Sequence, residues 1–451
     1  MIRVTVYDKQ QKNQIMEAAQ GETLMQLLGR YRIYFPGNCG GLGRCSRCQV
    51  LVDGQRKKAC RYVIERPCKV LLPFPFTSVL QSVTKHGQED SVRKEEAEKP
   101  YTISVDLGTT TIGMALCDAR GRILCKCGME NPQRSYGADV AARITYAKTE
   151  QGLHQLQSLV NEALLQGVEM LYRSIEEPFS GEEDWYIAGN PTMLHILAGL
   201  SPESIGSYPF EPMKKEAFTK EVAHLGTLHF LPCASGYIGA DVIVGAYVSE
   251  VDRKEQTTLF VDLGTNGEMI LSARGQLLAA SVAAGPAFEQ LLLGADALHI
   301  LCSMRKQQII DEEGTLMPPY FEEGYCCHTE AGETVVITQE DIRQLQLAKA
   351  AVMTGISLLC QRAGIAVSSI ECVLLAGGFG FYLKEEDAIF LRMFPECFAG
   401  KIKLCGNTSL QGTIQCSKKT DALQAFAQKI QTVDLSNEEA FHEEFIKNIN
   451  F

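Results

Sequence analysis

Apolar and polar residues alternate at the start of the chain, as they do along a half-buried strand. Residues 1–8 (MIRVTVYD) follow this two-residue period, whereas residues 22–30 (ETLMQLLGR) space their apolar side chains as an amphipathic helix does. Residues 47–64 (RCQVLVDGQRKKACRYVI) contain two short strand patterns separated by Asp53-Gly54, a dipeptide typical of tight hairpins. The pattern therefore predicts a small domain of strand, helix and hairpin.

A longer pattern occurs twice, at positions 156 residues apart. Residues 101–124 (YTISVDLGTTTIGMALCDARGRIL) resemble residues 257–278 (TTLFVDLGTNGEMILSARGQLL). Each copy has an apolar strand that ends in Asp-Leu-Gly-Thr, a tight turn, a second strand, Ala-Arg-Gly and a third strand. This period is too long for a solenoid repeat. We therefore expect residues 101–451 to form two similar α/β halves, of which the second begins near residue 257.

A third glycine-containing segment follows a strand pattern in residues 371–383 (ECVLLAGGFGFYL). Here an apolar run leads into Gly377, Gly378 and Gly380. Adjacent glycines between a strand and a helix can form a flat backbone surface for a nucleotide base or ribose. A tight strand-to-helix turn explains the same residues equally well when the segment is considered alone.

The segment between the two patterned regions predicts a linker. Residues 83–100 contain 9 charged residues in 18 and no aromatic residue, Leu or Ile. Such a segment cannot bury enough apolar surface to order itself, and as a coil its ends would lie about 24 Å apart. We therefore expect one domain over residues 1–82 and a second over residues 101–451.

Composition and charge exclude several classes of protein. The chain is 45% hydrophobic and 22% charged, and it has no apolar run of membrane-spanning length and no apolar signal core, so we expect a cytoplasmic protein. The net charge is −11, but residues 1–82 carry +8 and the remainder −19. The acidic bulk argues against nucleic-acid binding. The basic front could dock on an acidic partner or on the chain's own acidic body, although an ordinary charged surface explains it as well.

Four of the seventeen cysteines are clustered. Cys39, Cys45, Cys48 and Cys60 have the spacing C-x5-C-x2-C-x11-C, and glycines surround the first three. In a chain without export signals, metal or redox chemistry explains such a cluster better than disulfides do. Four thiolates in a glycine-rich loop suit a two-iron, two-sulfur (2Fe-2S) cluster, and structural zinc is the alternative. Cys68 is the local rival to Cys60.

The repeated Asp-Leu-Gly-Thr turns carry groups that bind phosphate and Mg²⁺. Asp106 and Asp262 end the first strand of each copy, where a carboxylate can hold Mg²⁺ directly or through water. Glycine allows the backbone to approach phosphate oxygens, and neighbouring hydroxyl and N–H groups can donate to them. The phosphate-binding candidates are Gly108, Thr109, Thr110 and Thr111 in the first copy and Gly264, Thr265, Asn266 and Gly267 in the second. Two such hairpins could hold a triphosphate from opposite sides.

These motifs resemble those of a known superfamily. The two DLGT hairpins and the AGGFG loop look like the phosphate-1, phosphate-2 and adenosine motifs of actin, sugar kinases and heat-shock-chaperone ATPases. Together with the CGGxGxCxxC loop, the chain more narrowly resembles the ATP-dependent reductive activators of corrinoid enzymes. The other segments that carry this resemblance are NPQRSYGADVAARI (131–144), GNPTMLHILAG (189–199), GYIGAD (236–241), GPAFE (285–289) and GNTSLQG (406–412). Longer members have linker and middle domains after the ferredoxin domain, where this chain has 18 residues, so dimerisation through a middle domain is not carried over.

The resemblance implies a fold and an activity. The fold would be an α+β β-grasp 2Fe-2S ferredoxin domain followed by a duplicated α/β, ribonuclease-H-like ATPase domain. The cluster would relay one electron to Co(II) of a corrinoid, and ATP binding and hydrolysis would drive this uphill reduction to Co(I). The partners would be a corrinoid protein or corrinoid-dependent methyltransferase and a low-potential donor of the ferredoxin or flavodoxin type. Asp106 and Asp262 would position Mg²⁺, and Gly377, Gly378 and Gly380 would approach adenosine.

Several interpretations stay open. Glu268, Asp241 and Asn190 are candidates for orienting the attacking water because each lies beside a glycine-rich turn, although turn and cap roles are ordinary for such residues. A small-molecule kinase of the same superfamily would need a substrate-pocket base, which the sequence does not identify. That hypothesis also leaves the cysteine cluster unexplained. An ATP-dependent activator of another redox enzyme and a non-catalytic redox or nucleotide switch fit the same motifs.

Overall fold

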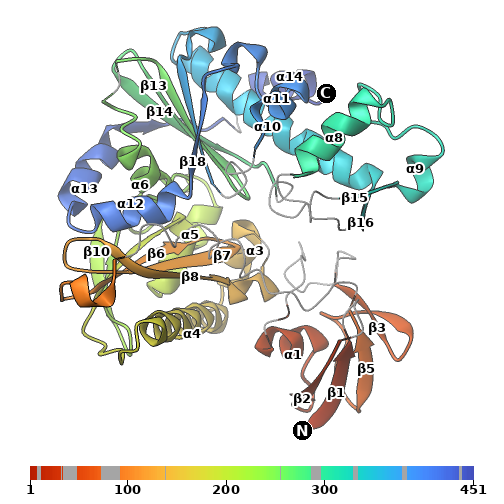
Figure 1. Ribbon diagram of the computed structural model, residues 1–451, viewed down its shortest axis with the longest axis vertical. Coiled ribbons are helices and arrows are strands. Elements are labelled where there is room, and N and C mark those ends of the chain that lie inside the picture. The colour runs from red at the N-terminus through yellow and green to blue at the C-terminus, as the bar shows by residue number, and fades with distance from the viewer. Residues whose placement is uncertain are drawn as a thin grey trace. The chain divides into compact units, whose positions relative to one another are not determined.

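The computed structural model divides the chain into two compact units, residues 1–230 and residues 231–451 (Figure 1). The residues that it describes are 1–7, 12–31, 33, 48–72, 92–137, 139–253, 255–285, 296–328, 334–377, 383–435 and 439–451. Four predicted site residues lie outside these ranges, namely Cys39, Cys45, Gly378 and Gly380. Within the described ranges, every helix is too short or too polar to cross a membrane.

The N-terminal part of the first unit is a five-stranded mixed sheet with one helix. Its strands are β1 (Ile2–Tyr7), β2 (Asn13–Ala18), β3 (Gln49–Val52), β4 (Gln55–Lys58) and β5 (Cys68–Leu71), in the order β2-β1-β5-β3-β4, and its helix is α1 (Leu24–Arg30). β1 is antiparallel to β2 and parallel to β5, which is the β-grasp arrangement. The predicted hairpin turn is confirmed, because Asp53 and Gly54 have φ values of 47° and 80° between β3 and β4.

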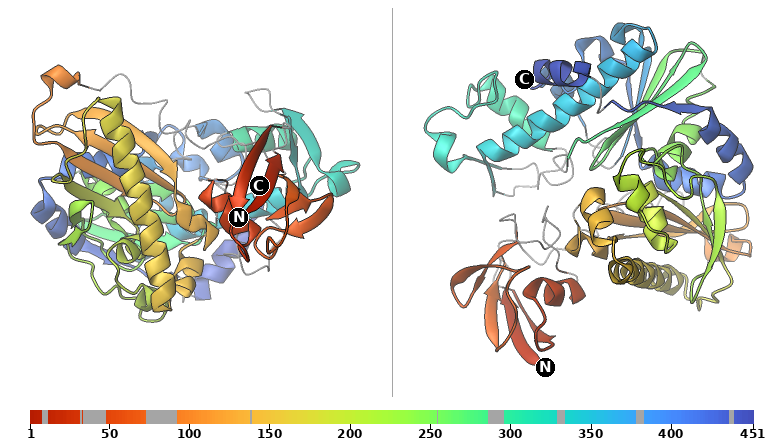
Figure 2. Two further views of the ribbon diagram at one scale, coloured as in Figure 1. Left: turned by 90° about the horizontal axis from the view of Figure 1, so that it is seen from below. Right: turned by 180° about the vertical axis from the view of Figure 1, so that it is seen from behind.

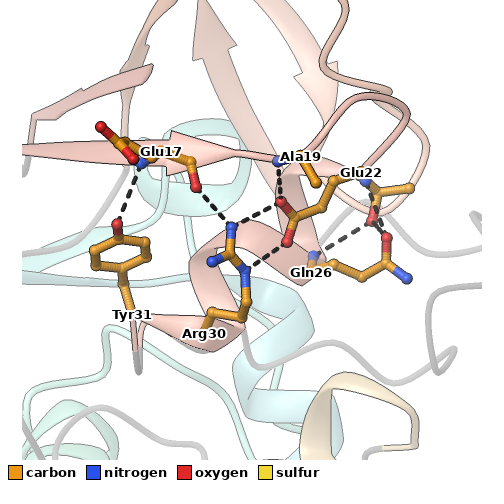
Figure 3. A network of polar contacts seen from close by, with 7 residues as sticks. Glu17, Ala19, Glu22, Gln26, Arg30 and Tyr31 are labelled. Carbon is orange, nitrogen blue, oxygen red and sulfur yellow. Dashed lines mark hydrogen bonds and ion pairs between the residues drawn. The ribbon is translucent and has the colours of Figure 1, made fainter. Parts of the chain in front are cut away.

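A polar network holds the two ends of α1 against β2 (Figure 3). The Arg30 guanidinium donates to Glu22 Oε1 at 2.8 Å and to the Glu17 carbonyl at 2.7 Å, while Glu17 N–H donates to Tyr31 Oη at 3.2 Å. Burial raises the pKa of Glu22, but hydrogen bonds from Arg30 and from the Ala19 N–H outweigh it and leave this pKa below its ordinary value. Glu22 is therefore ionised at neutral pH and fixes the helix in place.

Residues 92–100 pack against the following domain. Lys99 Nζ lies 2.9 Å from Glu177 Oε2, and the Glu98 carbonyl accepts a hydrogen bond from Ala119 N at 2.8 Å. The prediction of a coil across the whole linker is therefore wrong for this part. Its charged residues cannot order the segment alone, but they find ion-pair and backbone partners on the neighbouring surface. The earlier part of the predicted linker lies outside the described residues.

The rest of the first unit is a six-stranded sheet with helices on it (Figure 2). The strands are β6 (Thr102–Leu107), β7 (Thr111–Cys117), β8 (Ile123–Glu130), β9 (Asp184–Gly189), β10 (Phe218–Val222) and β11 (Gly226–Phe230), in the order β10-β11-β9-β6-β7-β8. The helical segments include η2 (Pro132–Ser135), α3 (Val140–Tyr146), α4 (Glu150–Ser174) and α5 (Pro191–Leu197). The long helix α4 buries its apolar face against β7 and β8 (Figure 1).

The second unit contains a matching six-stranded sheet. Its strands are β12 (Thr258–Leu263), β13 (Gly267–Ala273), β14 (Gln276–Val282), β17 (Cys372–Ala376), β18 (Ile402–Gly406) and β19 (Ile430–Thr432), in the order β18-β17-β12-β13-β14-β19. A hairpin of β15 (Tyr325–His328) and β16 (Thr334–Ile337) stands apart from it. The helices are α6 (Ala240–Val248), α8 (Asp296–Lys306), α9 (Tyr320–Glu323), α10 (Gln339–Arg362), α11 (Glu385–Phe390), α12 (Thr408–Cys416), α13 (Thr420–Lys429) and α14 (Glu439–Lys447).

The two sheets confirm the duplication predicted from the sequence repeat. In each, the three strands of the repeat are antiparallel neighbours, and the first of them pairs on its other side with a parallel strand, β9 or β17. The likeness extends to a glycine at the end of that parallel strand. A Cβ atom at Gly189 would lie 2.6 Å from the Leu107 carbonyl oxygen, and one at Gly377 would lie 2.5 Å from that of Leu263. Both halves therefore need glycine beside the Asp-Leu-Gly-Thr strand.

Candidate functional site

The N-terminal domain brings two of the predicted cysteine ligands together. Cys48 directly precedes β3 and Cys60 closely follows β4, and their Sγ atoms lie 3.3 Å apart. The hairpin register causes this approach, because Gln49 pairs with Lys58 at its open end. Both side chains are buried, and a separation of 3.3 Å is well beyond the ~2.05 Å of a disulfide bond. Two thiolates in this arrangement fit neighbouring positions on one metal centre.

Cys39 and Cys45 would have to complete such a centre. Within the part of the chain that the structure describes, no three His, Cys, Asp or Glu side chains are grouped as metal ligands. Cys68, the rival to Cys60, hydrogen-bonds with the Tyr62 side chain, and burial together with the charge of Asp53 raises the pKa of its thiol. The approach of Cys60 Sγ to within 3.3 Å of Cys48 Sγ favours Cys60 over Cys68 as the fourth ligand.

The first Asp-Leu-Gly-Thr turn joins β6 to β7. Gly108 N donates to the Thr111 carbonyl at 3.0 Å, and a Cβ atom at Gly108 would lie 2.6 Å from that carbonyl oxygen. Glycine is therefore required for the turn to close this tightly. Asp106 lies one residue before the end of β6, opposite Gly113 of β7. The strand thus delivers the predicted carboxylate to the edge of the sheet where the turn begins.

Asn190 is brought to this turn from the end of β9. Its Oδ1 accepts the Met193 N–H at 3.0 Å and thereby caps α5, and its Nδ2 donates to Thr109 Oγ1 at 2.9 Å. Both polar atoms of the side chain therefore have partners, one in the helix and one in the turn. Its assignment to the attacking water stays a prediction.

The second turn lies beside three carboxylates. Asp262 of β12 pairs directly with Glu268 of β13, and Asp241 approaches them from the first turn of α6. Burial raises the pKa of Glu268 well above its ordinary value, and the charges of Asp241 and Asp262 raise it further. A hydrogen bond from Asn266 opposes this effect. The three carboxylates make this region negatively charged, but in the described part of the chain they are not grouped as ligands of one metal ion. Mg²⁺ in proteins is commonly held by one or two carboxylates together with water and phosphate oxygens, so Asp262 alone could serve a magnesium-nucleotide here.

Gly377 lies against the same carboxylate. A Cβ atom at this position would be 2.6 Å from Asp262 Oδ1, and the backbone there has a φ of 91°. Any larger residue would therefore displace the Asp262 carboxylate as well as strain the backbone. Sequence reasoning assigned Gly377 to adenosine, and the structure adds that it shapes the carboxylate site.

Glutamine in place of Glu268 is expected to stabilise the nucleotide-free protein, by an amount that grows with pH. The folded-state pKa of Glu268 is raised above 4.5, so folding loses stability as pH rises from the ordinary glutamate range through that higher pKa. Glu268→Gln has no proton to lose. In magnesium-free buffer its melting temperature should match the parent near pH 5 and exceed it by about 2–4 °C at pH 8. Glu322→Gln, an exposed glutamate of α9, is the control. An equal difference at both pH values would contradict this expectation.

Comparisons with known proteins agree with this architecture. The family model described as RACo middle region matches residues 101–254, and the model described as the C-terminal domain of RACo, the ASKHA domain, matches residues 256–295 and 292–451. The expectation that 18 residues stand in place of the middle domains is therefore wrong, because residues 101–254, the first half of the predicted ATPase domain, match the middle region. This chain belongs to the RACo family of reductive activators. A corrinoid activation enzyme, RamQ, of Eubacterium limosum is 26% identical over 80% of this chain and 72% of its own length.

Two further proteins are similar to this chain over most of its length. The reductase of the methylated-amine-specific Co(II) corrinoid protein of Methanosarcina barkeri is 22% identical over 69% of this chain and 68% of its own. A solved structure of a reductive activator for a corrinoid, iron-sulfur protein superposes with a TM-score of 0.72 at 21% identity, over 99% of this chain and 98% of that one. The expected ATPase-type fold and the membership in an enzyme family are thereby confirmed.

Residues 131–144 belong to the segments that resemble the family, but their sequence indicates no role for them. In the structure, Asn131 and Arg143 from this segment both hydrogen-bond to the backbone of the first Asp-Leu-Gly-Thr turn. The sequence pattern around Asn131 and Arg143 does not distinguish them from ordinary cap and core residues. Their place between the DLGTTT and GNPTMLHILAG segments was the available indication of a role.

Proposed function

We propose that this chain is an ATP-dependent reductive activator of a corrinoid protein. In the reaction, Co(II) of the partner's corrinoid gains one electron from a low-potential donor and becomes Co(I), while ATP and water give ADP and phosphate. The observation that carries the proposal is the pair of Asp-Leu-Gly-Thr hairpins, one beside three carboxylates, in a chain of the RACo family.

The thiolates of Cys39, Cys45, Cys48 and Cys60 would hold the 2Fe-2S cluster, which when bound supplies a one-electron carrier. The close approach of Cys48 and Cys60 supports this assignment, and so does their burial, since the surrounding side chains shield the sulfur atoms from water. The hydrophobic core around them contains Val50 and Leu28. This core would fix the positions of the two thiolates while an electron arrives and leaves.

Asp262 would position Mg²⁺ in the second half, and Asp106 would do so in the first. Gly108, Gly264 and Gly267 would allow the backbone to approach phosphate oxygens closely. Thr109, Thr110 and Thr111, together with Thr265 and Asn266, would donate to those oxygens. Gly377 would contribute to the adenosine side together with Gly378 and Gly380. The three candidates for the attacking water remain Glu268, Asp241 and Asn190, and the position of Glu268 directly opposite Asp262 in the β12–β13 pair supports Glu268.

ATP has a physical purpose in such a system, because reduction of Co(II) is uphill from ordinary donors. Each 59 mV of unfavourable one-electron potential costs about 1.4 kcal/mol. Nucleotide binding can offset this cost only if ATP and ADP favour different conformations of the complex with the corrinoid protein. A conformational change of the ATPase domain that accompanies hydrolysis would supply the two conformations.

The proposal is tested with purified protein, a candidate corrinoid protein in the Co(II) state and Ti(III) as reductant under anaerobic conditions. We expect the absorption of Co(I) to appear when Mg-ATP is present and to stay absent without nucleotide or with a non-hydrolysable analogue. The same assay with a redox enzyme that lacks corrinoid is the control. Equal reduction with and without ATP would contradict an ATP-driven step, and reduction of the control enzyme alone would favour activation of another redox enzyme.

A further inference from the structure

The carbonyl groups of the first Asp-Leu-Gly-Thr turn are all held by hydrogen-bond donors. The Gly108 carbonyl accepts Asn131 Nδ2 at 2.8 Å, and the Thr110 carbonyl accepts Asn131 N at 2.8 Å. The Thr109 carbonyl accepts the Arg143 guanidinium, and the Thr111 carbonyl accepts Gly108 N. One asparagine and one arginine therefore hold three successive carbonyls of the turn.

The two donor side chains lie close together behind the turn. Asn131 Nδ2 and Arg143 Nη1 both contact Met193 Sδ, at 3.8 Å and 2.8 Å. The carbonyls of Gly108 and Thr109 consequently point toward the same side. In a trans peptide the C=O of one residue and the N–H of the next point in opposite directions. The N–H groups of Thr109 and Thr110 are thereby turned toward the other side of the turn.

Successive N–H groups that face one way form a concave anion site. A peptide can rotate as a unit, and rotation would replace one of these donors by a carbonyl oxygen that repels phosphate. Prevention of that rotation requires a donor behind the carbonyl. Arg143 is well suited to this task because it is fully buried and its guanidinium is also fixed by the Gly137 carbonyl at 2.9 Å and by Gln133 Oε1 at 3.1 Å.

We propose that Arg143, assisted by Asn131, is a positioning residue that sets the peptide orientation of the first phosphate-binding turn without touching the nucleotide. This inference rests on the proposed function, because it assumes that ATP phosphates meet the turn. The Thr109 hydroxyl is fixed in the same manner by Asn190 from β9. Asn131 before η2, Arg143 in α3 and Asn190 after β9 therefore fix the conformation of one turn.

The test compares ATP, which carries phosphates, with adenosine, which does not. Arg143→Lys keeps the positive charge but replaces the planar guanidinium by a single ammonium group. Lysine therefore cannot donate at once to the Thr109 carbonyl, the Gly137 carbonyl and Gln133 Oε1. We expect the dissociation constant for Mg-ATP, measured by titration calorimetry on the full chain, to rise about tenfold or more. The dissociation constant for adenosine should be unchanged. A purely structural role would weaken both ligands together.

Asn131→Ser supplies a second variant in case the arginine variant does not fold. Serine can still cap Gln133 N, as Asn131 Oδ1 does at 3.0 Å, but it is too short to reach the Gly108 carbonyl. We expect about fivefold weaker ATP binding and unchanged adenosine binding. Arg122→Lys is the matched control, because Arg122 pairs with buried Asp118 at the far end of β7. It should lower the melting temperature and leave both dissociation constants unchanged.

The outcomes separate the two proposals. Unchanged ATP binding in both variants, or equal losses for ATP and adenosine, would overturn the positioning role and leave the proposed function intact. Failure of the parent protein to bind Mg-ATP would remove the proposed function and this inference with it. Selective loss of ATP binding in either variant, with the Arg122→Lys control unaffected, would support the positioning role.

Discussion

Serine in place of either Cys48 or Cys60 will give a protein that lacks the visible absorption and the reduced-state paramagnetic resonance of a 2Fe-2S cluster. Their Sγ atoms lie 3.3 Å apart and both side chains are buried, as expected for two ligands of one cluster. A serine hydroxyl ionises far less readily than a thiol and is a harder donor, so it replaces a thiolate poorly. Iron and sulfide content after anaerobic reconstitution will measure the loss, which we expect to be nearly complete.

Cys68→Ser is the matched control for this experiment. Cys68 is also buried in the N-terminal domain, but its thiol is paired with Tyr62 and its pKa is raised. We expect this variant to assemble the cluster with the parent spectrum. ATP hydrolysis should be unchanged in all three variants, because the nucleotide groups belong to other domains of the chain. A normal spectrum in Cys60→Ser together with a lost spectrum in Cys68→Ser would make Cys68 the ligand.

Local features of the fold could be predicted where one short stretch of sequence determines the geometry. Asp53-Gly54 gave the β3–β4 hairpin because both positions need positive φ, which Gly and Asp tolerate best. The duplication was visible because both copies keep the strand, the turn and the glycine that closes it. These signals depend only on neighbours in sequence, so no knowledge of the tertiary structure was required.

Contacts between distant segments could not be predicted in the same way. Asp241 lies in the first turn of α6 and Glu268 in β13, and only the packing of that helix on the sheet brings the two carboxylates together. The correspondence of Gly189 with Gly377 was also missed, because the match is confined to Ala-Gly and becomes evident only when β9 and β17 are superimposed. The order of residues 92–100 likewise depends on partners far along the chain, such as Glu177 for Lys99.

Asparagine in place of Asp262 will reduce Mg²⁺-dependent ATP hydrolysis by about 100-fold or more and leave the cluster spectrum unchanged. Asparagine has the size of aspartate, so the tight contact with Gly377 is kept and only the charge that would hold Mg²⁺ is lost. Loss of this charge also lowers the pKa of Glu268, because one of the two carboxylates that repel its ionised form is gone. The variant should therefore be at least as stable as the parent in magnesium-free buffer. Steady-state phosphate release will test the loss of ATP hydrolysis, and the melting temperature will test the retained stability.

The matched control is Asp341→Asn, which alters the capping box at the start of α10. Asp341 accepts the Thr338 N–H at 3.0 Å. Asparagine should weaken this hydrogen bond and lower the free energy of unfolding by about 1 kcal/mol without affecting ATP hydrolysis. Corrinoid reduction separates the roles further. With Asp262→Asn, the donor should still reduce the cluster. Co(I) should not accumulate, because the unfavourable reduction of Co(II) is no longer coupled to ATP hydrolysis. Co(I) formation at the parent rate in this variant would show that hydrolysis at Asp262 and electron transfer are independent, and the coupling proposed for the two domains would be wrong.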